Sequence, residues 1–243
     1  MCIGRLVKAI FFDLDDTLYD VAEPFRRTIE MDFPEYKKLP SDNLFTDFRR
    51  HGDEVFFASQ RGEMTMDDMY VYRISKTLED YNVLISRGNA LQFQTAYEHR
   101  QKEICISPTM KSMLEKLAES KILLGVISNG PARHQMEKML NMGLDKYIPK
   151  ERLFVSGALG VDKPDVEIFR KVEALCGVEA GNSLYVGDSF VHDVVGASKA
   201  GWKSLWFNRR GKEMPDIGIF PDETVDNEEE LANRLVNLIK FIK

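Results

Sequence analysis

Short runs of consecutive apolar residues recur along the chain, and each run stops at polar residues. A strand that is covered on both faces of a sheet carries core side chains at every position, so such runs indicate buried strands. The predicted strands are Ala9–Phe12, Ile122–Ile127, Leu153–Ser156, Ser183–Gly187 and Ser204–Phe207, the last of the chain.

Between the strands, apolar residues return every three or four positions, as they do on one face of an amphipathic helix. The final helix is predicted to follow Asn227, with Leu231, Leu235, Leu238 and Ile242 on one face. Strands that alternate with helices predict an α/β fold, namely a Rossmann-like parallel sheet core with helices on both faces.

The pattern changes between Tyr19 and Glu103, where it becomes long, polar and helical in period, with no convincing strand. Helices are predicted over residues 42–60, 66–82 and 86–103. The chain is therefore expected to form a catalytic core from residues 1–18 and 104–243, interrupted by a helical cap domain over residues 19–103.

Composition narrows the classes of partner. A net charge of −6 argues against a nucleic-acid polymer or an anionic membrane, but it permits a small anionic substrate where local cations reverse the field. Apolar stretches are interrupted well before membrane-spanning length, and the N-terminus shows no long apolar leader. The cysteines, Cys2, Cys105 and Cys176, are odd in number and form no CxxC pair, which fits a cytoplasmic protein without a zinc site or disulfide framework.

Polar residues follow the predicted strands at the points where the strands end. Asp13 and Asp15 end the first strand, Ser128 and Asn129 follow the second, Lys163 comes after the third, and Asp188 follows the fourth. Each residue alone could be a helix cap, a turn residue or a surface charge. Carboxyl ends of parallel strands meet at one edge of the sheet, where ligands bind, and capping does not readily explain all four groups in register.

Phosphoryl transfer is the chemistry that requires this set. Asp13 and Asp188 can hold Mg²⁺, a hard cation that prefers carboxylate oxygens and water. Ser128 and nearby backbone N–H groups, at the start of a helix beginning near Pro131, can bind phosphate oxygens. Lys163 adds positive charge to the phosphate and balances the crowded carboxylates.

At these positions the chain resembles a known family. Asp13-Leu-Asp-Asp-Thr17, Ser128-Asn-Gly130, Lys163-Pro-Asp165 and Gly187-Asp-Ser-Phe-Val-His-Asp193 are similar, in order and in spacing, to the four motifs of the haloacid dehalogenase-like (HAD) hydrolases. The resemblance extends over nearly the whole core, and the helical insertion resembles the cap of the helical-cap subfamily, which closes over the site and excludes water.

The resemblance implies a role for each motif residue. Asp13 would be the nucleophile that forms an aspartyl-phosphate, and Asp15 the general acid and then base, its main-chain carbonyl also binding Mg²⁺. Asp188 would be the third metal ligand, and Asp193 would orient Lys163 or a metal-bound water. Thr17 would fix the loop that places Asp15. The predicted phosphate- and substrate-binding residues are Thr17, Ser128, Asn129, Lys163 and, in the cap, Arg73.

The reaction and the substrate remain open to several interpretations. Dehalogenases of this family lack an acid at the position of Asp15, because a halide leaving group needs no proton, so a phosphatase is favoured. Residues 62–74 and 201–211 resemble the 5'-nucleotidase-like branch, which favours a small phosphorylated metabolite such as a nucleoside monophosphate. A sugar-phosphate or phosphoglycolate-type phosphatase, a dehalogenase, a phosphomutase and a non-catalytic phosphoacceptor or binding protein are the alternatives.

Overall fold

The computed structural model describes residues 7–239, apart from the side chains of Asp42 and Gln60. The chain divides into two compact units, one built from the chain up to Asp20 and from Cys105 onward, and the other spanning Val21–Ile104. Cys2 and Ile242 lie outside the described residues.

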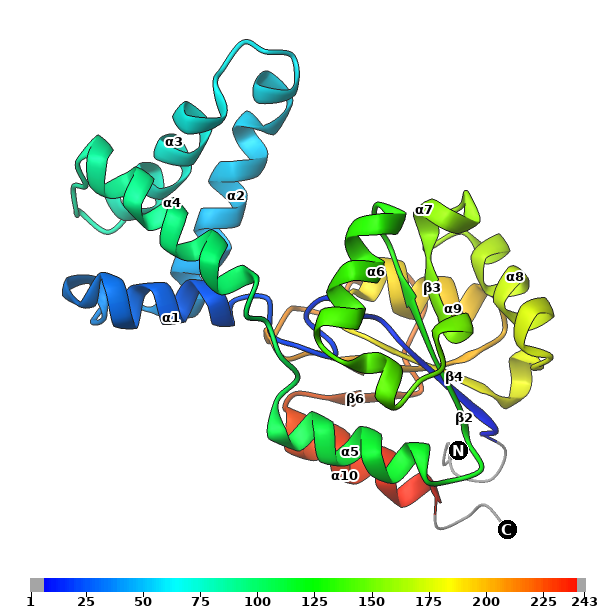
Figure 1. Ribbon diagram of the computed structural model, residues 1–243. Helices are drawn as coiled ribbons and strands as arrows, with labels where there is room; N and C mark the ends of the chain where they lie inside the picture. The colour runs from blue at the N-terminus through cyan, green and yellow to red at the C-terminus, as the bar shows by residue number, and fades with distance from the viewer. Residues whose placement is uncertain (1–6, 240–243) are drawn as a thin grey trace. The chain divides into compact units, whose positions relative to one another are not determined.

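The first unit is an α/β fold around one parallel sheet, which confirms the predicted fold class (Figure 1). The sheet has six strands in the order β3-β2-β1-β4-β5-β6, and every neighbouring pair is parallel. The strands are β1 (Ala9–Phe12), β2 (Leu123–Ser128), β3 (Leu153–Val155), β4 (Ser183–Gly187), β5 (Lys203–Phe207) and β6 (Glu223–Val225).

The prediction that Ser204–Phe207 is the last strand is wrong, because β6 follows it at the sheet edge. β6 is only three residues long and buries only Val225, so it leaves no apolar run for a sequence pattern to detect. β1 shows the opposite case, since all four of its residues are buried between β2 and β4.

Helices cover both faces of the sheet. The helices of this unit are α5 (Pro108–Ala118), α6 (Ala132–Asn141), α7 (Ser156–Leu159), α8 (Val166–Cys176), the π-helix η6 (Phe190–Val195), α9 (Gly196–Lys199) and α10 (Glu228–Ile239), with single 3₁₀ turns η3 (Leu144–Lys146), η4 (Lys150–Arg152) and η5 (Ala180–Asn182). Ala9 and Phe11 pack with α8 and α9. Figure 1 shows α5 and α10 side by side on the opposite side of the sheet.

The second unit is entirely helical in its regular structure. It contains α1 (Glu23–Asp32), a 3₁₀ turn η2 (Pro34–Tyr36), α2 (Ser41–Gln60), α3 (Met66–Glu79) and α4 (Arg87–Gln101). Thr65 and Ser86 cap α3 and α4 through their hydroxyl oxygens. Its core is rich in aromatic rings, with Phe25 in contact with Phe48 and Phe93. The sequence pattern anticipated α2, α3 and α4 but not α1.

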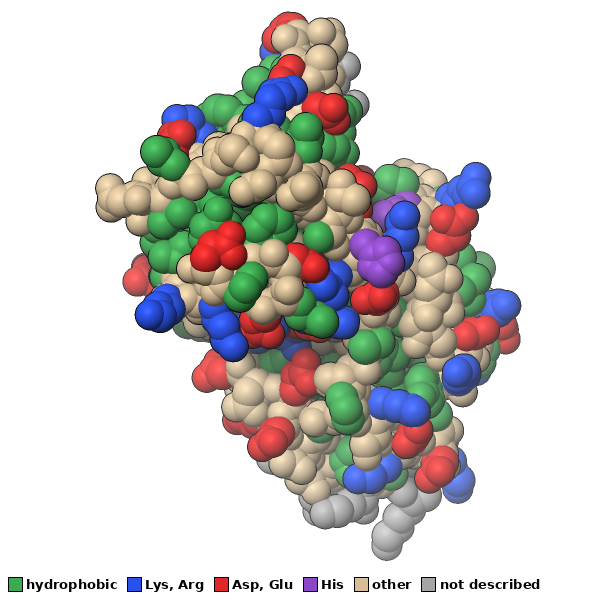
Figure 2. Space-filling view, turned by 60° about the vertical axis from the view of Figure 1, so that its left-hand side comes forward, with side chains coloured by type: hydrophobic (Ala, Val, Ile, Leu, Met, Phe, Trp, Pro, Cys, Tyr) green, Lys and Arg blue, Asp and Glu red, His purple; other side chains and the backbone are tan. Residues whose placement is uncertain are grey.

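The surface carries charged side chains of both signs, in agreement with the modest net charge. On the face in Figure 2, acidic and basic side chains are interspersed, with hydrophobic side chains scattered among them. Within residues 7–239, no helix combines the length and the hydrophobicity needed to cross a bilayer.

Candidate active site

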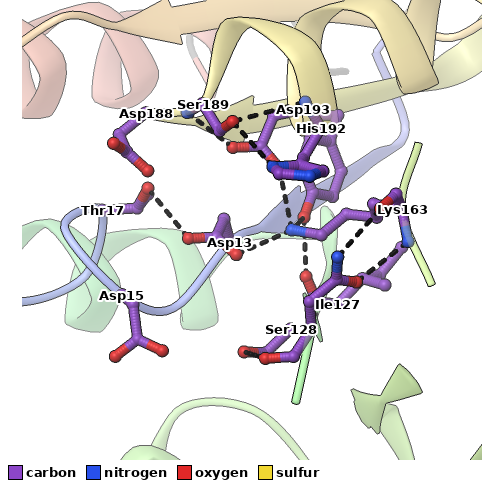
Figure 3. Close-up of polar contacts among 12 residues, drawn as sticks. Asp13, Asp15, Thr17, Ile127, Ser128, Lys163, Asp188, Ser189, His192 and Asp193 are labelled. Carbon is purple, nitrogen blue, oxygen red and sulfur yellow. Dashed lines mark hydrogen bonds and ion pairs between the residues drawn. The ribbon is translucent and has the colours of Figure 1, made fainter. Parts of the chain in front are cut away.

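The site begins where β1 ends. The Asp13 backbone N–H donates to the Val186 carbonyl of neighbouring β4 at 2.8 Å, so the sheet ladder itself places the Asp13 carboxylate at the sheet edge. That carboxylate is nearly buried, and the hydroxyl of buried Thr17 lies 3.4 Å from its Oδ2 (Figure 3). The chain turns sharply between them, with Asp16 at a φ of 63°.

Lys163 joins the acidic groups through three contacts. Its buried Nζ lies 2.7 Å from Asp13 Oδ1, 2.8 Å from Asp193 Oδ1 and 2.7 Å from the Tyr185 hydroxyl. An ammonium has three N–H donors, so each has a partner. The Tyr185 hydroxyl donates in turn to the Ile127 carbonyl at 2.6 Å. Burial lowers the pKa of Lys163, but Asp13 and Asp193 outweigh it and hold that pKa well above its ordinary value, so the group stays cationic.

The Asp193 side chain lies against the last residue of β4, Gly187. Besides its bond to Lys163, its Oδ2 accepts a hydrogen bond from the Ser189 backbone N–H at 2.9 Å, so both carboxylate oxygens are occupied. A Cβ at Gly187 would lie 2.2 Å from that Oδ2, so only a glycine at this position leaves room for the Asp193 side chain. Ser189 also begins the π-helix that carries Asp193, through its hydroxyl contact with the His192 N–H.

Asp188 completes an acidic cluster. One oxygen from each of Asp13, Asp188 and Asp193 lies within 4.8 Å of the others. Burial raises the pKa of Asp188, Lys212 at 2.9 Å lowers it, Asp193 raises it, and the net shift is upward. Burial likewise raises the pKa of Asp13 against the lowering effect of Lys163. Three carboxylates this close together, with the pKa values of Asp13 and Asp188 raised, fit a divalent cation such as Mg²⁺.

The phosphate-binding candidates after β2 lie in a tight loop. Ser128 is buried, and its Oγ is 2.9 Å from Gln135 Nε2. The Asn129 side chain bonds the backbone of Lys163 twice, as donor to its carbonyl and acceptor from its N–H, each at 2.9 Å. Asn129 thus ties the Lys163 loop to β2. Because its side chain is engaged there, the predicted contact of Asn129 with phosphate would be made by its backbone.

Asp15 points away from the Lys163 network (Figure 3). Its carboxylate accepts hydrogen bonds from Lys138 and Gln135, each at 2.7 Å, and from the hydroxyl of Tyr19. Burial raises the pKa of Asp15, but Lys138, Tyr19 and Gln135 outweigh it and lower that pKa below its ordinary value.

Arg73 is the one predicted site residue that belongs to the helical unit. Its guanidinium carbon lies 4.3 Å from the centre of the Phe48 ring and 5.1 Å from that of Tyr70, and Nη2 donates to Gln94 Oε1 at 2.5 Å. Its Nε is buried and, among the described residues, has no hydrogen-bond partner. Arg73 lines a pocket of about 350 Å³ within that unit, together with Tyr97.

The structure therefore brings together every predicted site residue of the core, from the carboxyl ends of β1, β2 and β4, the segments after them and the loop between α7 and α8. Sequence reasoning missed Tyr185, Gln135, Lys138 and Lys212, which contact those residues. Position in the chain could have identified three of these residues. Tyr185 lies inside a predicted strand, and Gln135 and Lys138 lie three residues apart on the helix that follows Ser128.

The arrangement can attack a phosphorus centre and shuttle a proton. Asp13 presents a carboxylate oxygen next to an ammonium, which lowers the repulsion an anionic substrate meets. The Asp15 carboxylate, two residues further along the chain, is not one of the three groups that Lys163 bonds. It can exchange a proton with a leaving group or water.

Comparison with known proteins identifies relatives. A model of the haloacid dehalogenase-like hydrolases matches residues 7–201. Glyceraldehyde 3-phosphate phosphatase of Pyrococcus abyssi is 28% identical over 212 residues, which cover 83% of this chain and 82% of the relative. Pyrimidine 5'-nucleotidase YjjG of Escherichia coli is 28% identical over 228 residues, which cover 93% of this chain and 96% of the relative.

Solved structures agree on the fold. The crystal structure of YfnB from Bacillus subtilis, bound to magnesium, superimposes with a TM-score of 0.64 at 23% identity and covers 95% of this chain and 99% of that protein.

Proposed function

The chain belongs to the haloacid dehalogenase-like hydrolases, and we propose that within this family it is a Mg²⁺-dependent phosphomonoester phosphatase that works through an aspartyl-phosphate on Asp13. The observation that carries the proposal is the pairing of Asp13, held against Lys163, with Asp15, held in a separate set of donors. A halide leaves without a proton, whereas an alkoxide needs one, so a positioned carboxyl at Asp15 favours phosphate esters over haloacids.

In the proposed reaction, Asp13 Oδ attacks phosphorus and the ester P–O bond breaks. Asp15, whose ionised form Lys138, Tyr19 and Gln135 favour, takes up a proton from solvent and gives it to the leaving oxygen. Water then attacks phosphorus, Asp15 takes a proton from that water, and the Asp13–phosphorus bond breaks to release inorganic phosphate. Lys163 stays cationic throughout and offsets the negative charge gathered around Asp13.

The phosphate oxygens would be bound by the Ser128 hydroxyl and by the backbone N–H of Asn129. Thr17, whose hydroxyl already contacts Asp13, would hold the loop that carries Asp15. Asp193 has both oxygens occupied by Lys163 and Ser189, so its role is to orient Lys163.

Magnesium would be held by the carboxylates of Asp13 and Asp188 and by the main-chain carbonyl of Asp15. When bound, it supplies positive charge that shields the phosphate from the incoming carboxylate. The raised pKa values of Asp13 and Asp188 support this assignment, because burial and the neighbouring Asp193 disfavour their charged forms and a bound cation would favour them. The magnesium-bound relative YfnB adds support.

The proposed substrate is a small phosphorylated metabolite, with a nucleoside monophosphate as the first candidate. The pyrimidine 5'-nucleotidase relative matches nearly the full length of the chain and supports that choice. A three-carbon sugar phosphate is the second candidate, favoured by the glyceraldehyde 3-phosphate phosphatase of Pyrococcus abyssi. Cys105 and Cys176 are free thiols, which supports a cytoplasmic location as part of the same proposal.

The test is release of inorganic phosphate by wild type, Asp13→Asn and a matched control, Asp216→Asn. Because an amide cannot form an acyl phosphate, Asp13→Asn should lower kcat by roughly a thousandfold or more. Asp216 is exposed, so its variant loses the same charge and should keep wild-type turnover. Circular dichroism checks that each variant is folded.

Two further arms separate the alternatives. EDTA should abolish turnover and added Mg²⁺ restore it, while Ca²⁺, with its looser coordination, should restore little. Halide release from a haloacid without phosphate release would establish the dehalogenase, and a stable phosphorylated chain without turnover the phosphoacceptor. Full activity of folded Asp13→Asn would refute the assigned nucleophile.

A further inference from the structure

Side chains outside the motif residues hold the carboxylate of Asp15. Lys138 Nζ lies 2.7 Å from Oδ1, and Gln135 Nε2 lies 2.7 Å from Oδ2. The Tyr19 hydroxyl also donates to Oδ1. With donors on both oxygens, the carboxylate is fixed in one orientation, although the Asp15 side chain is still 37% exposed.

Gln135 connects this carboxylate to the predicted phosphate-binding loop. It is 97% buried, since only 3% of its surface is exposed. Its Nε2 lies within hydrogen-bond distance of Ser128 Oγ, at 2.9 Å, and of the Asn129 carbonyl, at 3.0 Å, as well as of Asp15. One amide group therefore sets the spacing between the proton-transfer group and the hydroxyl that would bind phosphate.

The start of α6 explains why these two side chains point at one target. Residues three apart on a helix share a face, so Gln135 and Lys138 project together. The turn before the helix uses Gly130 at a φ of 138°, and a Cβ there would lie 3.1 Å from Gln135 Cγ. The Lys138 ammonium also lies 5.6 Å from the centre of the Tyr19 ring, so the ring and carboxylate together hold it.

We infer that Lys138 and Gln135 are positioning residues for the proton transfers of Asp15, an inference that rests on the proposed phosphatase function. In the first half-reaction Asp15 gives its proton to the leaving oxygen as the ester bond breaks. In the second it removes a proton from the attacking water as the Asp13–phosphorus bond breaks. Both transfers need the Asp15 carboxyl group in a fixed orientation, and Lys138 on Oδ1 and Gln135 on Oδ2 keep that orientation.

The test compares two substrates that differ in their need for a proton. An alkyl phosphate expels a strongly basic alkoxide, whereas 4-nitrophenyl phosphate expels a stable phenolate that needs little acid assistance. Lys138→Met should lower kcat/KM for the alkyl phosphate about 10- to 100-fold, within the range that general acid catalysis supplies. It should lower kcat/KM for 4-nitrophenyl phosphate less than about threefold, and Lys138→Arg, which keeps a donor, should restore most of the loss.

A second comparison asks whether Lys138 acts through Asp15. In an Asp15→Asn background, Lys138→Met should cause hardly any further loss of kcat/KM for the alkyl phosphate, because the group it positions is already gone. Gln135→Leu should repeat the pattern; since Gln135 is buried, the partly exposed Lys138 variant carries the test if the Gln135 variant does not fold.

The outcomes separate this inference from the proposed function. Equal losses on both substrates, or a full Lys138→Met loss that persists in the Asp15→Asn background, would show that Lys138 acts on the phosphoryl group and would overturn the inference. A wild-type protein that releases phosphate from neither substrate would instead refute the phosphatase proposal itself.

Discussion

Asp188 carries a contact with which a cation bound to the acidic cluster would have to compete. Asp13 and Asp193 are occupied by Lys163, which is buried, whereas Asp188 pairs with Lys212, whose side chain is 49% exposed. An exposed lysine loses little when it returns to water, so its contact with Asp188 is the weaker one. Lys212 therefore acts as a removable counter-charge for Asp188.

Lys212→Met should tighten Mg²⁺ binding. The substitution keeps the length of the side chain, removes the ammonium that shares Asp188, and leaves the cluster more negative. We expect the Kd for Mg²⁺, measured by isothermal titration calorimetry, to fall roughly 3- to 10-fold, which corresponds to about 0.7–1.4 kcal/mol.

Lys199→Met, at an exposed position of α9, is the control for the loss of one positive charge and should leave the Kd unchanged. Weaker binding in Lys212→Met would mean that Lys212 supports the ion's ligands rather than competing with the ion.

At the scale of elements, the site depends on short irregular segments between β-strands and helices. The π-helix η6 follows β4 directly and returns Asp193 beneath the strand end, where Gly187 leaves the space. Arg210, in the loop after β5, donates hydrogen bonds to Asp16 and Asp20. These contacts hold the loop after β1 in place. Side-chain contacts from distant parts of the chain, Lys163 with Asp193 and Arg210 with Asp16, hold these segments.

Gly187→Ala should damage both stability and turnover. The new Cβ would lie 2.2 Å from Asp193 Oδ2 and 2.4 Å from its Cγ, so Asp193 has to move and Lys163 loses a partner. Overpacking of this kind costs about 1–3 kcal/mol. We expect a fall in the thermal midpoint of roughly 2–4 °C per kcal/mol, with a lower kcat.

Gly181→Ala is the matched control, because no atom lies within 4 Å of a Cβ built there, and it should alter neither quantity. A Gly187→Ala protein with wild-type midpoint and turnover would show that Asp193 can leave its position without consequence.

At the scale of the molecule, the chain combines two units with different chemistry. Under the proposed function, the α/β unit gathers groups that would recognise a phosphoryl group, which every phosphomonoester shares. The helical unit has an aromatic core and a pocket of about 350 Å³ into which Arg73 and Tyr97 project. Under the proposed function, the phosphoryl site cannot distinguish leaving groups, so selectivity falls to the helical unit.

Arg73→Ala should separate selectivity from chemistry. We expect kcat/KM for the best metabolite substrate to fall about 10- to 100-fold, or about 1.4–3 kcal/mol of transition-state binding. Turnover of 4-nitrophenyl phosphate should barely change, because it presents no sugar or base to the guanidinium.

The buried contacts of Arg73 with Phe48 and Gln94 make a stability control necessary. Equal losses on both substrates together with a lower thermal midpoint would assign Arg73 to the packing of the helical unit, and unchanged kinetics on both would refute its role in selectivity.

The sequence by itself determined the α/β class, the positions of the buried strands and the points at which they end. A strand buried on both faces has an unbroken apolar run such as Ala9–Phe12, and a helix buried on one face has helical periodicity. Both patterns can therefore be recognised in the local sequence. The order of the motifs also made the family resemblance readable. By contrast, the three-residue β6 has too little apolar pattern of its own to be found in this way, and α1 was not predicted although Phe25, Thr28 and Ile29 form a buried face.

Only the tertiary structure decided which side chains meet. Lys138 and Gln135 reach Asp15 from more than a hundred residues away in the chain, and Tyr185 on β4 approaches Lys163 in the loop between α7 and α8. Residue type and spacing encode how much each position is buried, but a hydrogen bond depends on strand order, register and rotamer together. Those were set by the packing of the whole sheet, in which β1 lies between β2 and β4, and no local pattern carries that information.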